Sequence, residues 1–214
     1  MKRQLTLLAA AGFLGLAGIP APAQATPPPA GGPHAARFAN MKYTGGCGER
    51  DLSFSLSSQD TAVDIIPSSA VVEAGRIVRP DGTTTWSPGK ELKCTVTGTL
   101  QHAPGWRITA RAFRMHGFAD LTEGARAGLK SQFTLGKDTL GPITWNATGP
   151  ALVSFDPVTD ADDTTTTACG DGSPFVFTNR IVAAAGTDRT TTSYLTLDID
   201  DVRPPALSLV WERC

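Results

Sequence analysis

The sequence has 214 residues, with 19 lysines and arginines against 20 aspartates and glutamates, so its formal net charge is −1 at pH 7. This length is enough for one domain with a substantial hydrophobic core. A nearly neutral chain gives no electrostatic argument for nucleic acid or an anionic membrane as a partner, and we expect neither.

The chain starts with the layout of a secretory signal peptide over residues 1–25. Lys2 and Arg3 give a positive start, residues 5–19 carry no charge, and two small-residue cleavage patterns follow. As a helix, the uncharged run would span about 22 Å, shorter than the roughly 30 Å of a bilayer core. We therefore predict cleavage after Ala23 or Ala25 rather than a retained membrane anchor. The mature protein is expected to be secreted, periplasmic or extracellular.

The next segment is rich in proline, alanine and glycine, including Pro27-Pro28-Pro29. Because such a composition cannot build a hydrophobic core, we expect an extended tether over residues 26–40. A single domain without internal repeats is then predicted over residues 41–214.

Within that domain the dominant hydrophobic period is two residues, which is typical of β-strands with one buried face. Apolar and polar residues alternate at 52–56, 92–100, 129–135, 195–199 and 207–211. Turn residues separate these runs, for example at 80–82, 87–89 and 170–172. A helical pattern is absent apart from one candidate turn at 121–127. The pattern predicts an all-β antiparallel sandwich, for which a jelly roll is one version and a closed barrel is less favoured.

Four cysteines, Cys47, Cys94, Cys169 and Cys214, stand in this exported chain. An even number in an oxidising compartment predicts two disulfides, and their spacing favours Cys47–Cys94 and Cys169–Cys214, because each bridge then closes one half of the chain. A zinc site is weakly supported, since no two cysteines have the close spacing of zinc ligands.

An acidic stretch is a candidate calcium site. Asp156, Asp160, Asp162 and Asp163 lie close together in sequence, and carboxylate oxygens at this density could hold Ca²⁺. The stretch lacks the ligand order of an EF-hand loop, so a solvated loop without a cofactor is the favoured interpretation.

Trp86 is a candidate ligand-binding residue, because it stands among turn residues, where an exposed indole could stack on a sugar ring. A partly buried anchor of the loop is the alternative. Trp106, Trp145 and Trp211 have strand-like neighbours and are expected in the core.

No residue is expected to be catalytic. Ser173 stands in a segment that faintly resembles the nucleophile loop of chymotrypsin-like proteases, but the order of its residues differs and no histidine stands in a matching context. Asp198 and Asp200 share one face of a predicted strand at a spacing that glycosidases use. An exposed strand face would not raise the pKa of either carboxyl, so a solvated surface is favoured.

Short motifs around the cysteines give the chain a family resemblance. They occur in order at 45–47, 93–94, 103–106, 113–117, 168–170 and 211–214. The chain resembles a family of small secreted proteins from bacteria and filamentous fungi that is described only as a domain of unknown function. The resemblance implies an all-β exported fold with paired cysteines, and it implies no reaction and no catalytic residues.

Two functions remain open at this point. The favoured one is a non-catalytic extracellular module, binding or structural, whose partner would be a polysaccharide or another component of the cell envelope. The alternative is an extracellular hydrolase that acts on polysaccharide, suggested by the acidic residues and the secretory route.

Overall fold

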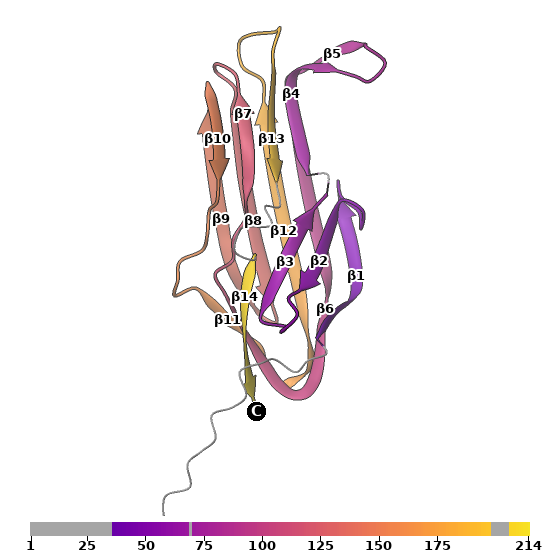
Figure 1. Cartoon of the computed structure of the whole chain (residues 1–214), viewed down its shortest axis with the longest axis vertical. Coiled ribbons are helices and arrows are strands. Elements are labelled where there is room, and N and C mark those ends of the chain that lie inside the picture. The colour runs from indigo at the N-terminus through magenta and orange to yellow at the C-terminus, as the bar shows by residue number, and fades with distance from the viewer. Residues whose placement is uncertain (1–35, 69, 198–205) are drawn as a thin grey trace, which may run out of the picture. The chain divides into compact units, whose positions relative to one another are not determined.

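Alternating burial of side chains divides the chain into β-strands in the computed structural model (Figure 1). The model describes residues 36–68, 70–197 and 206–214, and every structural statement below concerns these residues. The strands are β1 (Arg37–Gly45), β2 (Leu52–Leu56), β3 (Ala62–Pro67), β4 (Val71–Val78), β5 (Thr84–Ser87), β6 (Gly89–Arg111), β7 (Gly117–Leu121), β8 (Arg126–Leu135), β9 (Asp138–Thr148), β10 (Ala151–Phe155), β11 (Thr164–Thr166), β12 (Gly170–Ala184), β13 (Thr192–Leu197) and β14 (Leu207–Arg213).

These strands form two antiparallel sheets. The larger has the order β2-β3-β14-β6-β12-β8-β9, with β1 and β11 also paired to β6, and the smaller has the order β10-β7-β13-β4-β5. Strand β6 is 23 residues long and organises the larger sheet. Its first half pairs with β1 and β12, and its second half pairs with β11 and β14.

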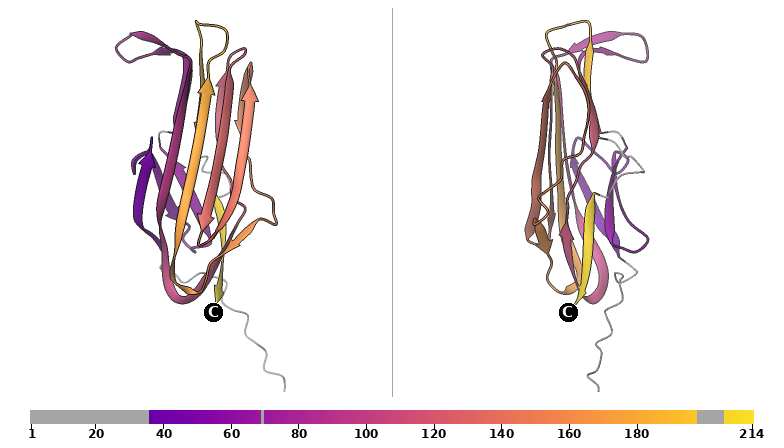
Figure 2. Two further views of the ribbon diagram at one scale, coloured as in Figure 1. Left: turned by 180° about the vertical axis from the view of Figure 1, so that it is seen from behind. Right: turned by 60° about the vertical axis from the view of Figure 1, so that its left-hand side comes forward.

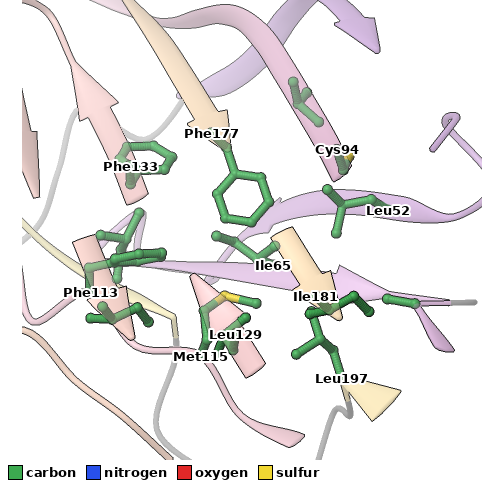
Figure 3. Packing of buried hydrophobic residues seen from close by; sticks show 14 of the residues in the cluster. Leu52, Ile65, Cys94, Phe113, Met115, Leu129, Phe133, Phe177, Ile181 and Leu197 are labelled. Atoms are coloured by element: carbon green, nitrogen blue, oxygen red, sulfur yellow. The ribbon is translucent and has the colours of Figure 1, made fainter. Parts of the chain in front are cut away.

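The hydrophobic core lies between the two layers. Seen from behind, β6, β12, β8 and β9 lie foremost (Figure 2), and their far side is covered by the smaller sheet together with β2, β3 and β14, the strands of the larger sheet that fold over it. Phenylalanines fill much of the core, and Phe113, Phe133, Phe175 and Phe177 are all at most 1% exposed. Figure 3 shows Phe133 and Phe177 on the larger sheet facing Ile65 and Leu52, which come from β3 and β2.

The structure confirms the all-β antiparallel sandwich predicted from the alternation. It also confirms both disulfides, Cys47–Cys94 and Cys169–Cys214. Each bridge secures a neighbour of β6: Cys47 follows β1 and joins Cys94 within β6, while Cys169 precedes β12 and joins Cys214 after β14. Among the described residues, no helix is long and apolar enough to cross a membrane.

Some local expectations differ from the structure. The predicted turn at 170–172 is wrong: Gly170 and Gly172 start β12 and form a bulge against β6, a place where glycine tolerates the irregular backbone. The candidate helical turn at 121–127 is a tight turn between β7 and β8, in which the Ala125 amide donates to the carbonyl of Thr122. Strand β1 begins at Arg37, inside the segment expected as tether.

Candidate ligand-binding face

Two aromatic side chains stand on the outer face of the smaller sheet. Phe118 on β7 and Tyr194 on β13 are half-buried, and their ring centroids lie 6.0 Å apart. Residues that alternate with them point into the core and are at most 4% exposed, namely Ala119, Leu121, Leu195 and Leu197. The aromatic pair therefore faces solvent rather than the sandwich interior.

Carboxylates flank Tyr194 on both sides. In the sheet register, Tyr194 pairs with Asp120 on β7 and with Glu73 on β4. Neighbouring strands are about 4.8 Å apart, so both carboxylates lie within reach of a molecule that rests on the Tyr194 ring. We call this surface, consisting of Phe118, Asp120, Tyr194 and Glu73, the aromatic face.

The next row of the same sheet extends the aromatic face toward the edge of the sandwich. Phe118 pairs with Thr196 on β13, and Thr196 pairs with Val71 on β4. Val71 is 39% exposed and lines a hollow of about 150 Å³. A chain-like ligand that crosses the strands from Phe118 would thus end at this hollow.

That hollow lies beside the Cys47–Cys94 disulfide. Asp51, Lys90 and Asn179 contribute polar groups to its lining. Asp51 accepts a hydrogen bond from the Gly48 amide at 2.7 Å, and the Asn179 carbonyl oxygen accepts one from the Ser131 hydroxyl at 2.6 Å. The hollow is therefore a small recess with both polar and apolar walls, and the Cys47–Cys94 disulfide lies in its lining.

Trp86 lies on β5, in the hairpin that extends from the end of β4 (Figure 1). It is 38% exposed, and the guanidinium carbon of Arg189 lies 5.6 Å from its ring centroid. This cation–π contact covers one face of the indole. Sugar binding at Trp86 stays a prediction, and it would use the uncovered ring face or displace Arg189.

The loops around Trp86 are organised by aspartates. Asp81 and Asp188 each accept hydrogen bonds from the hydroxyl and amide of the threonine two residues later. These bonds hold the pKa of both carboxyls below its usual range, with the threonine hydroxyl as the larger cause. Both loops are therefore turns stabilised by hydrogen bonds from the threonine to the aspartate side chain.

The acidic stretch does not form a cluster of metal ligands. Asp156 forms an ion pair with Arg114 at 3.0 Å, and Asp160, Asp162 and Asp163 are exposed in the loop before β11. No group of three or more acidic, histidine or cysteine side chains that could hold a metal occurs within residues 36–68, 70–197 and 206–214. Calcium binding at this stretch stays untested.

We expect no change in melting temperature when millimolar calcium is added to the purified protein. A cation that bound only the folded state would raise the melting temperature by mass action. Differential scanning fluorimetry with and without a chelator measures this directly. A rise of several degrees that disappears in the Asp160→Asn, Asp162→Asn variant would contradict the expectation.

The residues considered for catalysis are Ser173, Asp198 and Asp200. Ser173 is 3% exposed within β12, and this burial removes it from any substrate. Asp198 and Asp200 lie outside the described residues.

Trp145 and Trp211 pack against the core as expected. Trp106 was expected in the core as well, but it is half-buried outside the core cluster, with the Arg213 guanidinium carbon 5.2 Å from its ring centroid.

Sequence reasoning missed the aromatic face. Phe118 and Tyr194 each stand at an outward position of a strand whose inward positions are already apolar. An aromatic residue at such a position was the signal in the sequence that could have identified this face. The convergence of Glu73, Asp120 and Tyr194 depends on the strand order, because their strands are far apart in the sequence.

Comparisons with known proteins add a family and a distant structure. A family model described as "Domain of unknown function (DUF4360)" matches residues 35–214. No curated protein matches the chain. A solved structure titled "Structure of TmCBM61 in complex with beta-1,4-galactotriose at 1.4 A resolution" is similar at 9% identity and a TM-score of 0.27, covering 82% of this chain and 90% of that chain. A TM-score this low does not establish a shared fold.

Proposed function

The chain belongs to the DUF4360 family, a domain of unknown function, and for this member we propose a non-catalytic module that binds a neutral polysaccharide outside the cell. The observation that carries the proposal is the aromatic face. Phe118 and Tyr194 lie side by side on an exposed sheet surface, with hydrogen-bond acceptors next to them.

The chemistry of this face suits a sugar chain. The C–H faces of pyranose rings are apolar and pack on aromatic rings, while their hydroxyls donate to carboxylates. Asp120 and Glu73 supply such acceptors on both sides of Tyr194. Their negative charge would repel an acidic polymer, which favours a neutral glycan.

The direction of the ligand follows from the row of exposed positions. Phe118, Thr196 and Val71 are successive partners across β7, β13 and β4, so they span about 10 Å. The hollow beside Cys47–Cys94 follows at the end of the row. A glycan of two or three sugar units would cross the strands and place its last unit near Asp51 and Lys90.

An extracellular setting agrees with the two disulfides, which persist in oxidising compartments. The signal-like N-terminus supports the same location. The hydrolase alternative is not favoured by a specific observation, since Asp156 is paired with Arg114 and Ser173 is buried.

The test is affinity electrophoresis of the mature protein in gels that contain cellulose derivatives, xylan, β-1,3-glucan or solubilised peptidoglycan. We expect retardation by at least one neutral polymer. Phe118→Ala and Tyr194→Ala should each weaken binding about tenfold or more, as loss of a central aromatic anchor does. Scoring released sugars in the same samples tests the hydrolase alternative.

Val158→Ala serves as the control, because it removes a side chain that is 45% exposed and lies outside the aromatic face, and it should bind like the unaltered protein. Trp86→Ala tests the other predicted site, and binding at the aromatic face requires that this variant retain binding when Phe118→Ala and Tyr194→Ala lose it. Retardation that depends on Trp86 and not on Phe118 or Tyr194 would move the site to the β4–β5 hairpin and contradict the proposal for the aromatic face.

A further inference from the structure

The outer surface of the larger sheet, on the other side of the sandwich from the aromatic face, is positively charged. Outward positions of β1, β6, β12 and β8 alternate with buried ones, and these outward positions carry Arg37, Lys42, Lys93, Arg126, Lys130 and Arg180. Among the described residues of the same strands, Glu91 is the acidic side chain at a regularly alternating outward position, and Asp171 is exposed at the bulge that starts β12. We call this surface the basic face. Its charge contrasts with the near neutrality of the whole chain.

Three of these cations form a row across neighbouring strands. Lys93 on β6 pairs in register with Arg180 on β12, and Arg180 pairs with Lys130 on β8. Like charges at directly opposite positions of a sheet destabilise it. The row therefore opposes folding unless negative charge is brought to it.

Glu91 offsets only part of this charge. Its carboxylate accepts a hydrogen bond from Arg180 at 2.7 Å. That hydrogen bond and the positive charges of Arg180 and Lys93 hold the pKa of Glu91 below its usual range. Lys93 and Lys130 form no salt bridge with another described residue, so the row retains net positive charge.

A hollow lies at one end of the row. It measures about 220 Å³, and Lys130, Arg180, Thr144 and Asn146 line it together with Gly128. A Cβ atom at Gly128 would lie 2.7 Å from the Asn146 side-chain oxygen. Glycine inside a central strand often marks a close approach to another group, and here it leaves room beside two cations.

We propose that the basic face binds an anionic polysaccharide, with its acidic groups along the Lys93–Arg180–Lys130 row and one unit in the hollow beside Gly128. Complementary charge is the argument for this occupant. The uncharged outward residues nearby, including Thr95, Thr97, Thr178, Gln132 and Thr144, offer hydrogen bonds to sugar hydroxyls. This site is separate from the aromatic face and does not depend on it.

Single-stranded nucleic acid fits this surface less well. Proteins that bind it combine cations with aromatic side chains on which the bases stack. The outward positions of β1, β6, β12, β8 and β9 that carry the basic face are occupied by no aromatic residue in the described part of the chain. The chemistry therefore favours a polymer of hydroxylated, acidic sugars.

The experiment measures binding of the full mature protein to immobilised polygalacturonate, which carries carboxylates, and to purified wall teichoic acid, which carries phosphodiesters. We expect binding to at least one, weakened by raising sodium chloride from about 50 to 300 mM. The Lys93→Ala, Lys130→Ala variant should bind about 25-fold more weakly, since each basic residue near an anionic surface contributes about fivefold. The polymer bound better identifies carboxylate or phosphate as the preferred group.

Matched controls separate this site from general attraction of charge. The Arg50→Ala, Arg79→Ala variant removes two exposed cations outside the basic face and should bind normally. The Lys93→Arg, Lys130→Arg variant keeps the charge and should also bind. Equal weakening in the Arg50, Arg79 variant, no weakening in the Lys93, Lys130 variant, or tighter binding to single-stranded DNA than to both polymers would each overturn the proposal. Retardation by neutral glycans, which depends on Phe118, should be unchanged throughout.

Discussion

Replacing Cys47 and Cys94 with alanine should lower the free energy of unfolding by about 4 kcal/mol or more. The bridge joins residues separated by 47 positions, and opening a loop of that length returns about 4 kcal/mol of conformational entropy to the unfolded chain. Cys94 is also 3% exposed, so its truncation leaves a void at the core edge. Urea denaturation followed by tryptophan fluorescence measures the loss.

The Cys169→Ala, Cys214→Ala variant is the matched comparison. Its bridge spans 45 positions, so the entropic loss should be nearly the same, about 4 kcal/mol. Both of these cysteines are exposed, and no buried void is expected. A loss for this variant that exceeded the loss for the Cys47, Cys94 variant would show that burial at Cys94 contributes nothing.

Phe177→Ala should cost about 3–5 kcal/mol of stability, the range for removing a fully buried aromatic ring. Phe177 is 0% exposed in the middle of β12. Its ring contacts the rings of Phe54 on β2 and of Phe113 in the segment between β6 and β7, with centroid distances of 5.6 Å and 6.3 Å. Because the ring lies between the layers, surrounding groups cannot close the void without moving a strand.

Val176→Ala provides the control for that measurement, because Val176 neighbours Phe177 on β12 but faces outward. Its cost should stay below about 1 kcal/mol. If both substitutions cost the same in thermal or urea denaturation, the alternation assigned to β12 would be wrong.

The sequence was informative about the strands because their apolar phase is regular. Runs at 52–56, 129–135 and 207–211 all became strands with the predicted side chains inward. Bends and bulges were not predictable in the same way. Gly170 and Gly172 have the composition of a turn, yet pairing with β6 makes them part of a strand, and this pairing requires contacts that no local pattern contains.

The functional surfaces were harder to predict for a related reason. The row of Lys93, Arg180 and Lys130 exists only because β12 lies between β6 and β8, and the sequence separates these residues widely. An isolated lysine on the polar phase of a strand is unremarkable, whereas three cations in register are a strong electrostatic feature. Trp86 could be identified as a candidate from the turn residues next to it in the sequence. Phe118 and Tyr194 form a candidate site only because the fold places their rings side by side.

The length of β6 also has a consequence for how the chain folds. Arg107 in its second half pairs with Glu212 on β14, 105 positions later. Sheets that depend on such distant pairings fold slowly, over milliseconds to seconds, because the loop must close before the contacts form. Until β14 arrives, one edge of β6 has unpaired backbone groups that another chain could bind. The strand that organises the finished sheet is thus open to pairing with another chain for part of the folding process.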